Sequence, residues 1–215
     1  MIYTSQVSDG PMKPLNNADA EGVWNRRYIF FHDHGIRPED VTFVRLEYEE
    51  DDYRRYMSIG DEYRGDGITR PSSVIVDALV TAQTGHALFL PLADCIGAVL
   101  HDPTQNVLML SHLGRHNLER NGGSASVQYL IENHAVDPKN LKVWLSPAAG
   151  KANYPLHAFD NRGLHEVAVE QITSAGVIRE KIEISPIDTT TNPNYFSHSE
   201  FLKGKREVDG RFCVV

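Results

Sequence analysis

Residues 88–114 read Leu-Phe-Leu-Pro-Leu-Ala-Asp-Cys-Ile-Gly-Ala-Val-Leu-His-Asp-Pro-Thr-Gln-Asn-Val-Leu-Met-Leu-Ser-His-Leu-Gly. Two apolar runs of strand length flank the turn-forming residues 102–106. Apolar runs on either side of an Asp-Pro turn are typical of a hairpin whose strands are both buried. We therefore predict a buried hairpin here and expect the rest of the chain to pack around it.

The predicted hairpin carries a thiol and an imidazole. Cys95 follows Asp94 in the first run, and the second run ends in Ser111 and His112. Pairing of the two strands would bring Cys95 and His112 to one end of a sheet. Such a pair is typical of a nucleophile with its base, or of two ligands of a soft metal. A buried cysteine beside a capping histidine explains the same pattern equally well, because cysteine packs readily in cores.

Composition restricts the classes of protein that fit. The chain has 215 residues, 41% hydrophobic and 23% charged, which indicates one globular domain spanning residues 1–215. Its net charge of -8 argues against a nucleic-acid binder or a protein that binds anionic membranes. No apolar run is long enough to span a bilayer, and no signal peptide is evident at the first residues. With only Cys95 and Cys213 as cysteines, we expect a cytoplasmic protein.

Periodicity along the chain predicts both helices and strands. Helical spacing of apolar residues is found in 20–34, 123–134 and 161–176, and we expect Trp24, Tyr28 and Phe31 in the core. Further strands are predicted at 41–46, 74–81, 141–146, 181–185 and 210–215. The charged stretch 47–70 is interpreted as a solvated loop. Because helices and strands mix without strict βαβ alternation, we predict a single α/β domain with a mixed sheet and flanking helices.

Several short motifs in this order resemble the YfiH family, also called the laccase-domain or peptidoglycan-editing-factor family. The motifs are Asp-Ala-Leu-Val-Thr at 77–81, Ala-Asp-Cys at 93–95, Ser-His-Leu-Gly at 111–114, Trp-Leu-Ser-Pro-Ala-Ala-Gly at 144–150, Asn-Tyr-Phe-Ser at 194–197 and Asp-Gly-Arg at 209–211. The resemblance implies an α/β fold related to toxin deamidases that use a Cys–His pair. It also implies a zinc ion held by one Cys and two His, and phosphorolysis of purine nucleosides or deamination of adenosine. Polyphenol oxidation is an older attribution, and removal of wrong amino acids from cell-wall precursors is another.

Carried over to this chain, the resemblance makes Cys95 and His112 two of the zinc ligands. A thiolate and an imidazole suit zinc, and a site with three protein ligands leaves a position for water or substrate. Asp94 would orient His112, act as an acid or base, or cap a backbone N–H. With Cys95 and His112, it completes the predicted catalytic set.

The chain also departs from the family motifs. The family's first ligand is the His of a Gln-Val-His-Gly motif, and here Glu49 is nearest to that position. A carboxylate can bind zinc, and His86 and His101, near the hairpin, are further candidate ligands. Three family arginines are replaced, at Gln6, at Arg115-His116 and at His198. Arginines hold phosphate through paired hydrogen bonds, so these changes argue against plain phosphorolysis with the family's usual groups. We assign Arg115 to substrate contact, and His116 and His198 to substrate contact or proton transfer.

Three functions therefore stay open from the sequence. The first is a zinc enzyme, monomeric or homodimeric, whose small-molecule substrates are a purine nucleoside and phosphate. The second is a catalytically degenerate relative that acts as a binding or scaffold protein. The third is a metal-free amide hydrolase with Cys95 as nucleophile and His112 as base.

Overall fold

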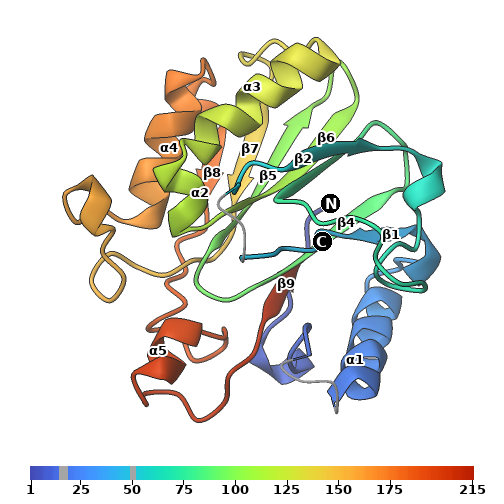
Figure 1. Cartoon of the computed structure of the whole chain (residues 1–215), viewed down its shortest axis with the longest axis vertical. Helices are drawn as coiled ribbons and strands as arrows, with labels where there is room; N and C mark the ends of the chain where they lie inside the picture. The colour runs from blue at the N-terminus through green and yellow to red at the C-terminus, as the bar shows by residue number, and fades with distance from the viewer. Residues whose placement is uncertain (15–18, 49–51) are drawn as a thin grey trace.

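Two mixed β-sheets pack face to face and carry helices on their outer faces (Figure 1). The computed structural model describes residues 1–14, 19–48 and 52–215. The six-stranded sheet has the order β2 (Tyr56–Ile59), β3 (Ala78–Thr81), β6 (Val107–Leu113), β5 (Ile96–Asp102), β7 (Lys142–Leu145), β8 (Ile182–Ile184). The three-stranded sheet has the order β1 (Val41–Phe43), β4 (Ala87–Leu92), β9 (Phe212–Val214). The chain thus forms the predicted α/β domain, with two sheets where one was expected.

Helices cover the outer face of each sheet. The helices are α1 (Ala20–Asp33), α2 (Arg115–Glu119), α3 (Gly122–His134), α4 (Leu164–Ser174) and α5 (His198–Leu202). Apolar residues of α3 and α4 form one core with the six-stranded sheet, and those of α1 form another with the three-stranded sheet. Among the described residues, no helix is long and apolar enough to cross a membrane.

Strand β5 shows why the middle strands of the larger sheet are apolar on both faces. Ile96, Ala98 and Leu100 pack under the helices, whereas Val99 belongs to the core between the two sheets. Successive side chains of a strand point to opposite faces, so a strand covered on both sides needs an uninterrupted apolar run. This is the pattern that the sequence shows at 96–100.

The predicted hairpin is confirmed for β5 and β6, which pair antiparallel with Gly97 opposite His112. The prediction was wrong for the beginning of the stretch, because its first apolar run is two strands in two sheets. β4 pairs with β1 and β9, and the chain then bends at 93–95 to enter β5. Asp94, at φ 75°, has the left-handed backbone that redirects the chain, a conformation that Asp tolerates better than most residues.

The other predicted elements are largely present. The helices predicted at 20–34, 123–134 and 161–176 are confirmed as α1, α3 and α4, with ends shifted by up to a few residues. Trp24 and Tyr28 were wrongly placed in the core, since they are 45% and 47% exposed and stack on each other outside α1. Phe31 is fully buried, as expected. The polar stretch contains strand β2, which the sequence did not predict. β2 pairs with β3 and forms the edge of the larger sheet.

His86, at the turn before β4, is buried with one ring nitrogen unsatisfied. Thr42 Oγ1 donates to the carbonyl of Tyr63 at 2.6 Å and lies 2.7 Å from Nε2 of His86. The hydroxyl has one proton, so Nε2–H of His86 must donate to it, and Nδ1 has no partner within residues 1–14, 19–48 and 52–215. Burial, followed by the charge of Arg64, lowers the pKa of His86 below its usual value. His86 is therefore held neutral.

This buried imidazole makes the stability of the fold depend on pH. Because the folded pKa is lowered, the unfolded chain binds more protons once the pH falls below about 6.5, the ordinary histidine value. We expect the free energy of unfolding to fall between pH 7.5 and 5.5, and His86→Gln to lose less over that interval than the unchanged protein. Urea unfolding at the two pH values measures both. His32→Gln, which removes an imidazole with 76% of its side chain exposed, is the control; equal losses in all three proteins would contradict the prediction.

Candidate active site

The end of the β5–β6 hairpin brings Cys95 and His112 together. Cys95 lies in the bend just before β5, and His112 lies near the end of β6 opposite Gly97. The backbone N–H of His112 donates to the carbonyl of Asp77 at 2.8 Å, and the Asp77 carboxylate pairs with Arg55 at 2.9 Å. Strand pairing and this anchor fix the backbone that carries the imidazole.

Gly114, directly after β6, leaves room between the two side chains. A Cβ atom at Gly114 would lie 2.8 Å from Sγ of Cys95 and 3.2 Å from Nε2 of His112. Sγ and Nε2 therefore border the same small space, which only the missing side chain of Gly114 keeps open. The backbone of Gly114 is extended, with φ -93° and ψ -178°, so glycine is required here for space and not for conformation.

Both reactive groups are held in their uncharged forms. His112 is 2% exposed, and neither of its ring nitrogens has a hydrogen-bond partner in the described part of the chain. Burial, with the nearby charges of Lys13 and His116, lowers the pKa of His112 to about 3. Burial and the neighbouring Asp94 raise the pKa of Cys95 to about 12. An unsatisfied buried polar group costs roughly 1–3 kcal/mol, so His112 is left ready for a ligand at a cost to stability.

Asp94 positions the chain around this pair. Its carboxylate accepts hydrogen bonds from Thr189 Oγ1 at 2.9 Å and from the backbone N–H of Ser199 at 2.7 Å. Its backbone carbonyl accepts from the N–H of Ala149 at 2.8 Å. Because both nitrogens of His112 lack partners, Asp94 does not orient that ring, and capping a backbone N–H is the predicted role that it fulfils.

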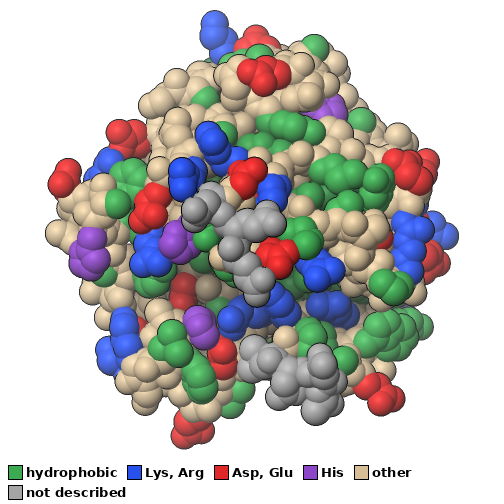
Figure 2. Space-filling model, viewed as in Figure 1, with side chains coloured by type: hydrophobic (Ala, Val, Ile, Leu, Met, Phe, Trp, Pro, Cys, Tyr) green, Lys and Arg blue, Asp and Glu red, His purple; other side chains and the backbone are tan. Residues whose placement is uncertain are grey.

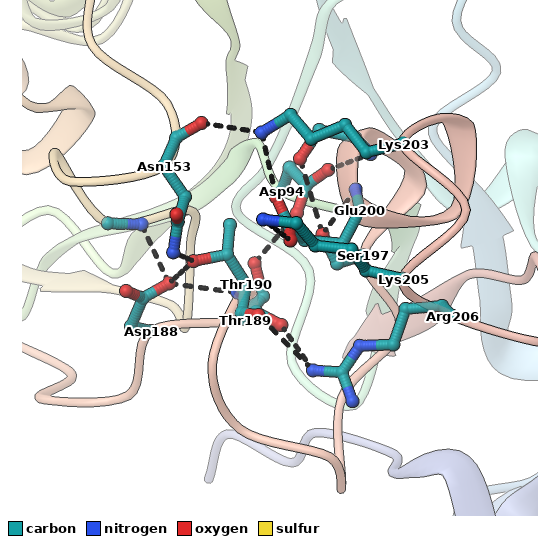
Figure 3. A network of polar contacts seen from close by, with 12 residues as sticks. Asp94, Asn153, Asp188, Thr189, Thr190, Ser197, Glu200, Lys203, Lys205 and Arg206 are labelled. Carbon is teal, nitrogen blue, oxygen red and sulfur yellow. Dashed lines mark hydrogen bonds and ion pairs between the residues drawn. The ribbon is translucent and has the colours of Figure 1, made fainter.

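The contacts of Asp94 belong to a larger polar network at the C-terminal part of the chain (Figure 3). Asp188 accepts from Gly150 N and from Thr190, which holds the loop after β7 against the following segment. Glu200, buried in α5, pairs with Lys203 at 2.7 Å and Lys205 at 3.3 Å. The network fixes α5 beside Asp94, and so beside Cys95.

A cavity of about 430 Å³ opens above Cys95 and His112. The three residues predicted to contact substrate, Arg115, His116 and His198, all line it. Arg115 is exposed at the start of α2, and one of its guanidinium nitrogens lies 3.2 Å from Nε2 of His116. The ring of His116 stacks on Tyr53 with centroids 4.8 Å apart. The structure thus brings the predicted substrate residues to one cavity, which has the size of a small-molecule site.

Other lining residues were missed in the sequence. Lys13, from the loop before α1, and Arg211, just before β9, supply positive charge. Lys13 has no hydrogen bond or ion pair with any described residue, and burial together with Arg211, Arg27 and Arg45 lowers its pKa. On the face shown in Figure 2, Lys and Arg side chains gather with His near the centre. Lys13 lies in a Gly- and Pro-containing loop with no periodic signal, so only the fold places it here.

Cys95 and His112 fit a zinc ion as two of its ligands, because a thiol that loses its proton and a bare imidazole nitrogen are donors that zinc prefers. Within residues 1–14, 19–48 and 52–215, no three His, Cys, Asp or Glu side chains are grouped so as to hold a metal. Glu49, the expected third ligand, lies outside the described residues. His86 and His101 line other cavities and not this one, so they do not replace it.

Comparison with known proteins connects this site to a family. Residues 5–159 match the family model described as multi-copper polyphenol oxidoreductase laccase. The chain is 32% identical over 161 residues to a purine nucleoside phosphorylase of Corynebacterium glutamicum, a match that covers 71% of this chain and 62% of that protein. It is 38% identical over 147 residues to one of Streptomyces coelicolor, covering 66% and 57%. The chain therefore matches less than two thirds of the length of either relative.

Solved structures share the fold. YlmD of Geobacillus stearothermophilus superposes with a TM-score of 0.82 at 20% identity, covering 95% of this chain and 83% of that one. YfiH of Bacillus licheniformis gives 0.80 at 21% identity, covering 90% and 80%.

Filling the space at Gly114 tests the geometry of the site. In Gly114→Ala the added methyl would lie too close to Sγ of Cys95 and Nε2 of His112, so one of them must move. We expect zinc affinity to fall at least about tenfold while the helical and strand content stays unchanged. Zinc titration with a competing chelator and circular dichroism measure the two quantities. Gly85→Ala is the control because a Cβ there meets nothing within 4 Å; alanine at its φ of +73° is strained and costs about 1 kcal/mol or more, so this variant also shows what lost stability alone does to zinc affinity. Unchanged zinc affinity in Gly114→Ala would contradict the prediction.

Proposed function

The chain belongs to the family described as multi-copper polyphenol oxidoreductase laccase, and from that membership we propose that it cleaves purine nucleosides with phosphate. The products would be the free purine and ribose 1-phosphate. The curated relatives named purine nucleoside phosphorylase support this reaction class. The structural observation that carries the proposal is the buried Cys95–His112 pair, with both nitrogens of His112 lacking partners among the described residues, at the base of a cavity lined by Lys13, Arg115 and Arg211.

Cys95 and His112 would hold a zinc ion, with Glu49 as our candidate for the third ligand. When bound, zinc supplies a Lewis acid that polarises an oxygen or nitrogen of the substrate. The raised pKa of Cys95 and the lowered pKa of His112 are the directions expected of two buried metal ligands when no cation is bound. A cation favours the thiolate and bonds the neutral imidazole, which relieves the cost of burying both groups.

Positive charge around the cavity supports an anionic co-substrate. Lys13, Arg115 and Arg211 line it, although the whole chain carries a net charge of -8. The family arginines replaced in this chain argued against phosphate binding. Lys13 supplies positive charge from another position, and Arg211 keeps the arginine of the Asp-Gly-Arg motif. Hydrogen bonds from charged donors to phosphate are about twice as strong as neutral ones. We infer that phosphate binds beside Lys13 and Arg211.

The metal-free thiol hydrolase is disfavoured by the same electrostatics. A nucleophilic cysteine needs a low thiol pKa and a base that accepts its proton. Here burial raises the pKa of Cys95 to about 12 and lowers that of His112 to about 3, so the proton stays on sulfur. We therefore favour the phosphorolytic reaction over amide hydrolysis.

Product analysis tests the proposed reaction. Zinc-loaded protein with inosine and phosphate should release hypoxanthine and ribose 1-phosphate, and Cys95→Ala should lower kcat/KM at least about 100-fold because it removes a metal ligand. Adenosine separates the alternatives, since phosphorolysis gives adenine whereas deamination gives inosine and ammonia. Cys213→Ala, at the other cysteine and outside the cavity, is the matched control. No phosphate-dependent cleavage of either nucleoside would overturn the proposal and favour a binding protein.

The role of Lys13 in phosphate binding is tested separately. Lys13→Met keeps the length and the apolar part of the side chain but removes its charge. We expect the KM for phosphate to rise about 10-fold or more, with a smaller change in the KM for inosine, because a hydrogen bond to a charged group contributes roughly 1.5–3 kcal/mol. Initial rates at varied phosphate give the value. Lys142→Met, at an exposed position on β7, should leave both constants unchanged; an unaltered phosphate KM in Lys13→Met would exclude this placement.

A further inference from the structure

His198, the first residue of α5, forms a carboxylate–imidazole pair at the cavity. Its Nδ1 lies 3.0 Å from Oδ2 of Asp209, and its side chain is 41% exposed. Nε2 of His198 has no hydrogen-bond partner among the described residues, and the residue lines the cavity above Cys95. One ring nitrogen is therefore bound to the protein, and the other is left for a ligand.

The carboxylate of Asp209 is itself held in place. Oδ1 of Asp209 accepts from Nη1 of Arg211 at 2.8 Å and from the backbone N–H of Gly210 at 2.9 Å. Its side chain is only 12% exposed, so Asp209 has little freedom to turn away from His198. A carboxylate on Nδ1 keeps the proton of the neutral ring on that nitrogen and leaves the lone pair on Nε2, where a ligand can reach it.

The other two histidines that line the cavity are less suited to proton transfer. His112 is 2% exposed and is the residue that we assign to zinc, so its ring is not available to exchange a proton with substrate. His116 has both ring nitrogens near charged neighbours, with Nε2 at 3.2 Å from Arg115 and Nδ1 at 3.6 Å from Glu119. Of these three, only His198 combines a half-buried, hydrogen-bonded carboxylate partner with a ring nitrogen that makes no hydrogen bond within the described chain.

We propose that His198, positioned by Asp209, is the acid that protonates the departing purine. This role rests on the proposed phosphorolysis. As the bond between C1′ and N9 breaks, its electron pair moves onto the purine, which takes the Nε2 proton from the imidazolium. A phosphate oxygen forms the new bond to C1′, and the proton of the resulting phosphate ester returns to Nε2. Protons and electrons balance in this reaction without any further reactant. Lys13, Arg115 and Arg211 line the same cavity and would hold the phosphate.

A pair of substrates separates this role from a structural one. Inosine needs a proton on its leaving base, whereas 7-methylinosine already carries a positive charge on the base and leaves as a neutral species. In His198→Gln we expect kcat for inosine to fall about 10²- to 10⁴-fold, the usual contribution of general acid catalysis, and kcat for 7-methylinosine to change less than about threefold. The limb of the inosine pH profile that reports the protonated acid should disappear in the same variant.

Further variants test the positioning residue and the specificity of the effect. Asp209→Asn should show the same selective loss for inosine at smaller size, because it retains a hydrogen-bond acceptor for Nδ1 but removes the charge. His32→Gln removes an exposed histidine that also lies beside an aspartate, at 3.4 Å, and should leave both substrates unaffected. Zinc content should stay unchanged in every variant.

The outcomes are distinguishable. Equal loss for both nucleosides in His198→Gln, with the unchanged protein active, would overturn the acid role and leave phosphorolysis standing. Unchanged cleavage of inosine in that variant would also overturn it. If the zinc-loaded unchanged protein cleaves neither nucleoside, the proposed function fails, and the role of His198 fails with it.

Discussion

The buried carboxylate of Asp94 is the contact on which the site depends. Its backbone turns the chain from the smaller sheet into the larger one, and its two oxygens hold Thr189 and the backbone of Ser199. Segments nearly a hundred residues apart in the sequence therefore meet at the residue that precedes Cys95. Hydrogen bonds to a buried charge contribute about 1.5–3 kcal/mol each, enough to outweigh the strain of a left-handed aspartate. The contacts of Asp94 thus hold the turn, Cys95 and α5 in fixed positions relative to one another.

The base of the cavity and its walls favour ligands of opposite charge. Cys95 and His112 are kept neutral by their surroundings, which stores an electrostatic cost that a bound cation would relieve. Above them lie Lys13, which has no ion pair with a described residue, and Arg211, which pairs with Asp209. The floor therefore favours a cation and the walls favour an anion. This separation is what the proposed zinc-assisted phosphorolysis would use.

The sequence predicted the elements whose pattern is local. The β5–β6 hairpin and the helices α1, α3 and α4 follow from apolar periodicity and turn residues, which report how one segment alone is covered. Strand β2 was not predicted because it lies in a polar stretch, and it forms by pairing with β3 at the edge of the sheet. The ring pair of Trp24 and Tyr28 satisfied helical spacing, but α1 covers a sheet of only three strands, so that face remains in solvent. The split of 88–100 into two sheets also needed a partner, since β9 comes from the far end of the chain.

At the candidate site, the sequence by itself determined which chemistry is present: one thiol and one imidazole separated by a hairpin, in an order of motifs that resembles a known family. It also marked Arg115, His116 and His198 as residues near substrate. Only the tertiary structure decided which further groups meet them. Lys13 comes from a loop without periodicity, and the Asp-Gly-Arg motif at 209–211 does not say that Asp209 meets His198. These positions depend on how the two sheets stack and how Asp94 anchors the C-terminal segment. Local pattern fixes an element, whereas a cavity is fixed by contacts between elements that no local pattern records.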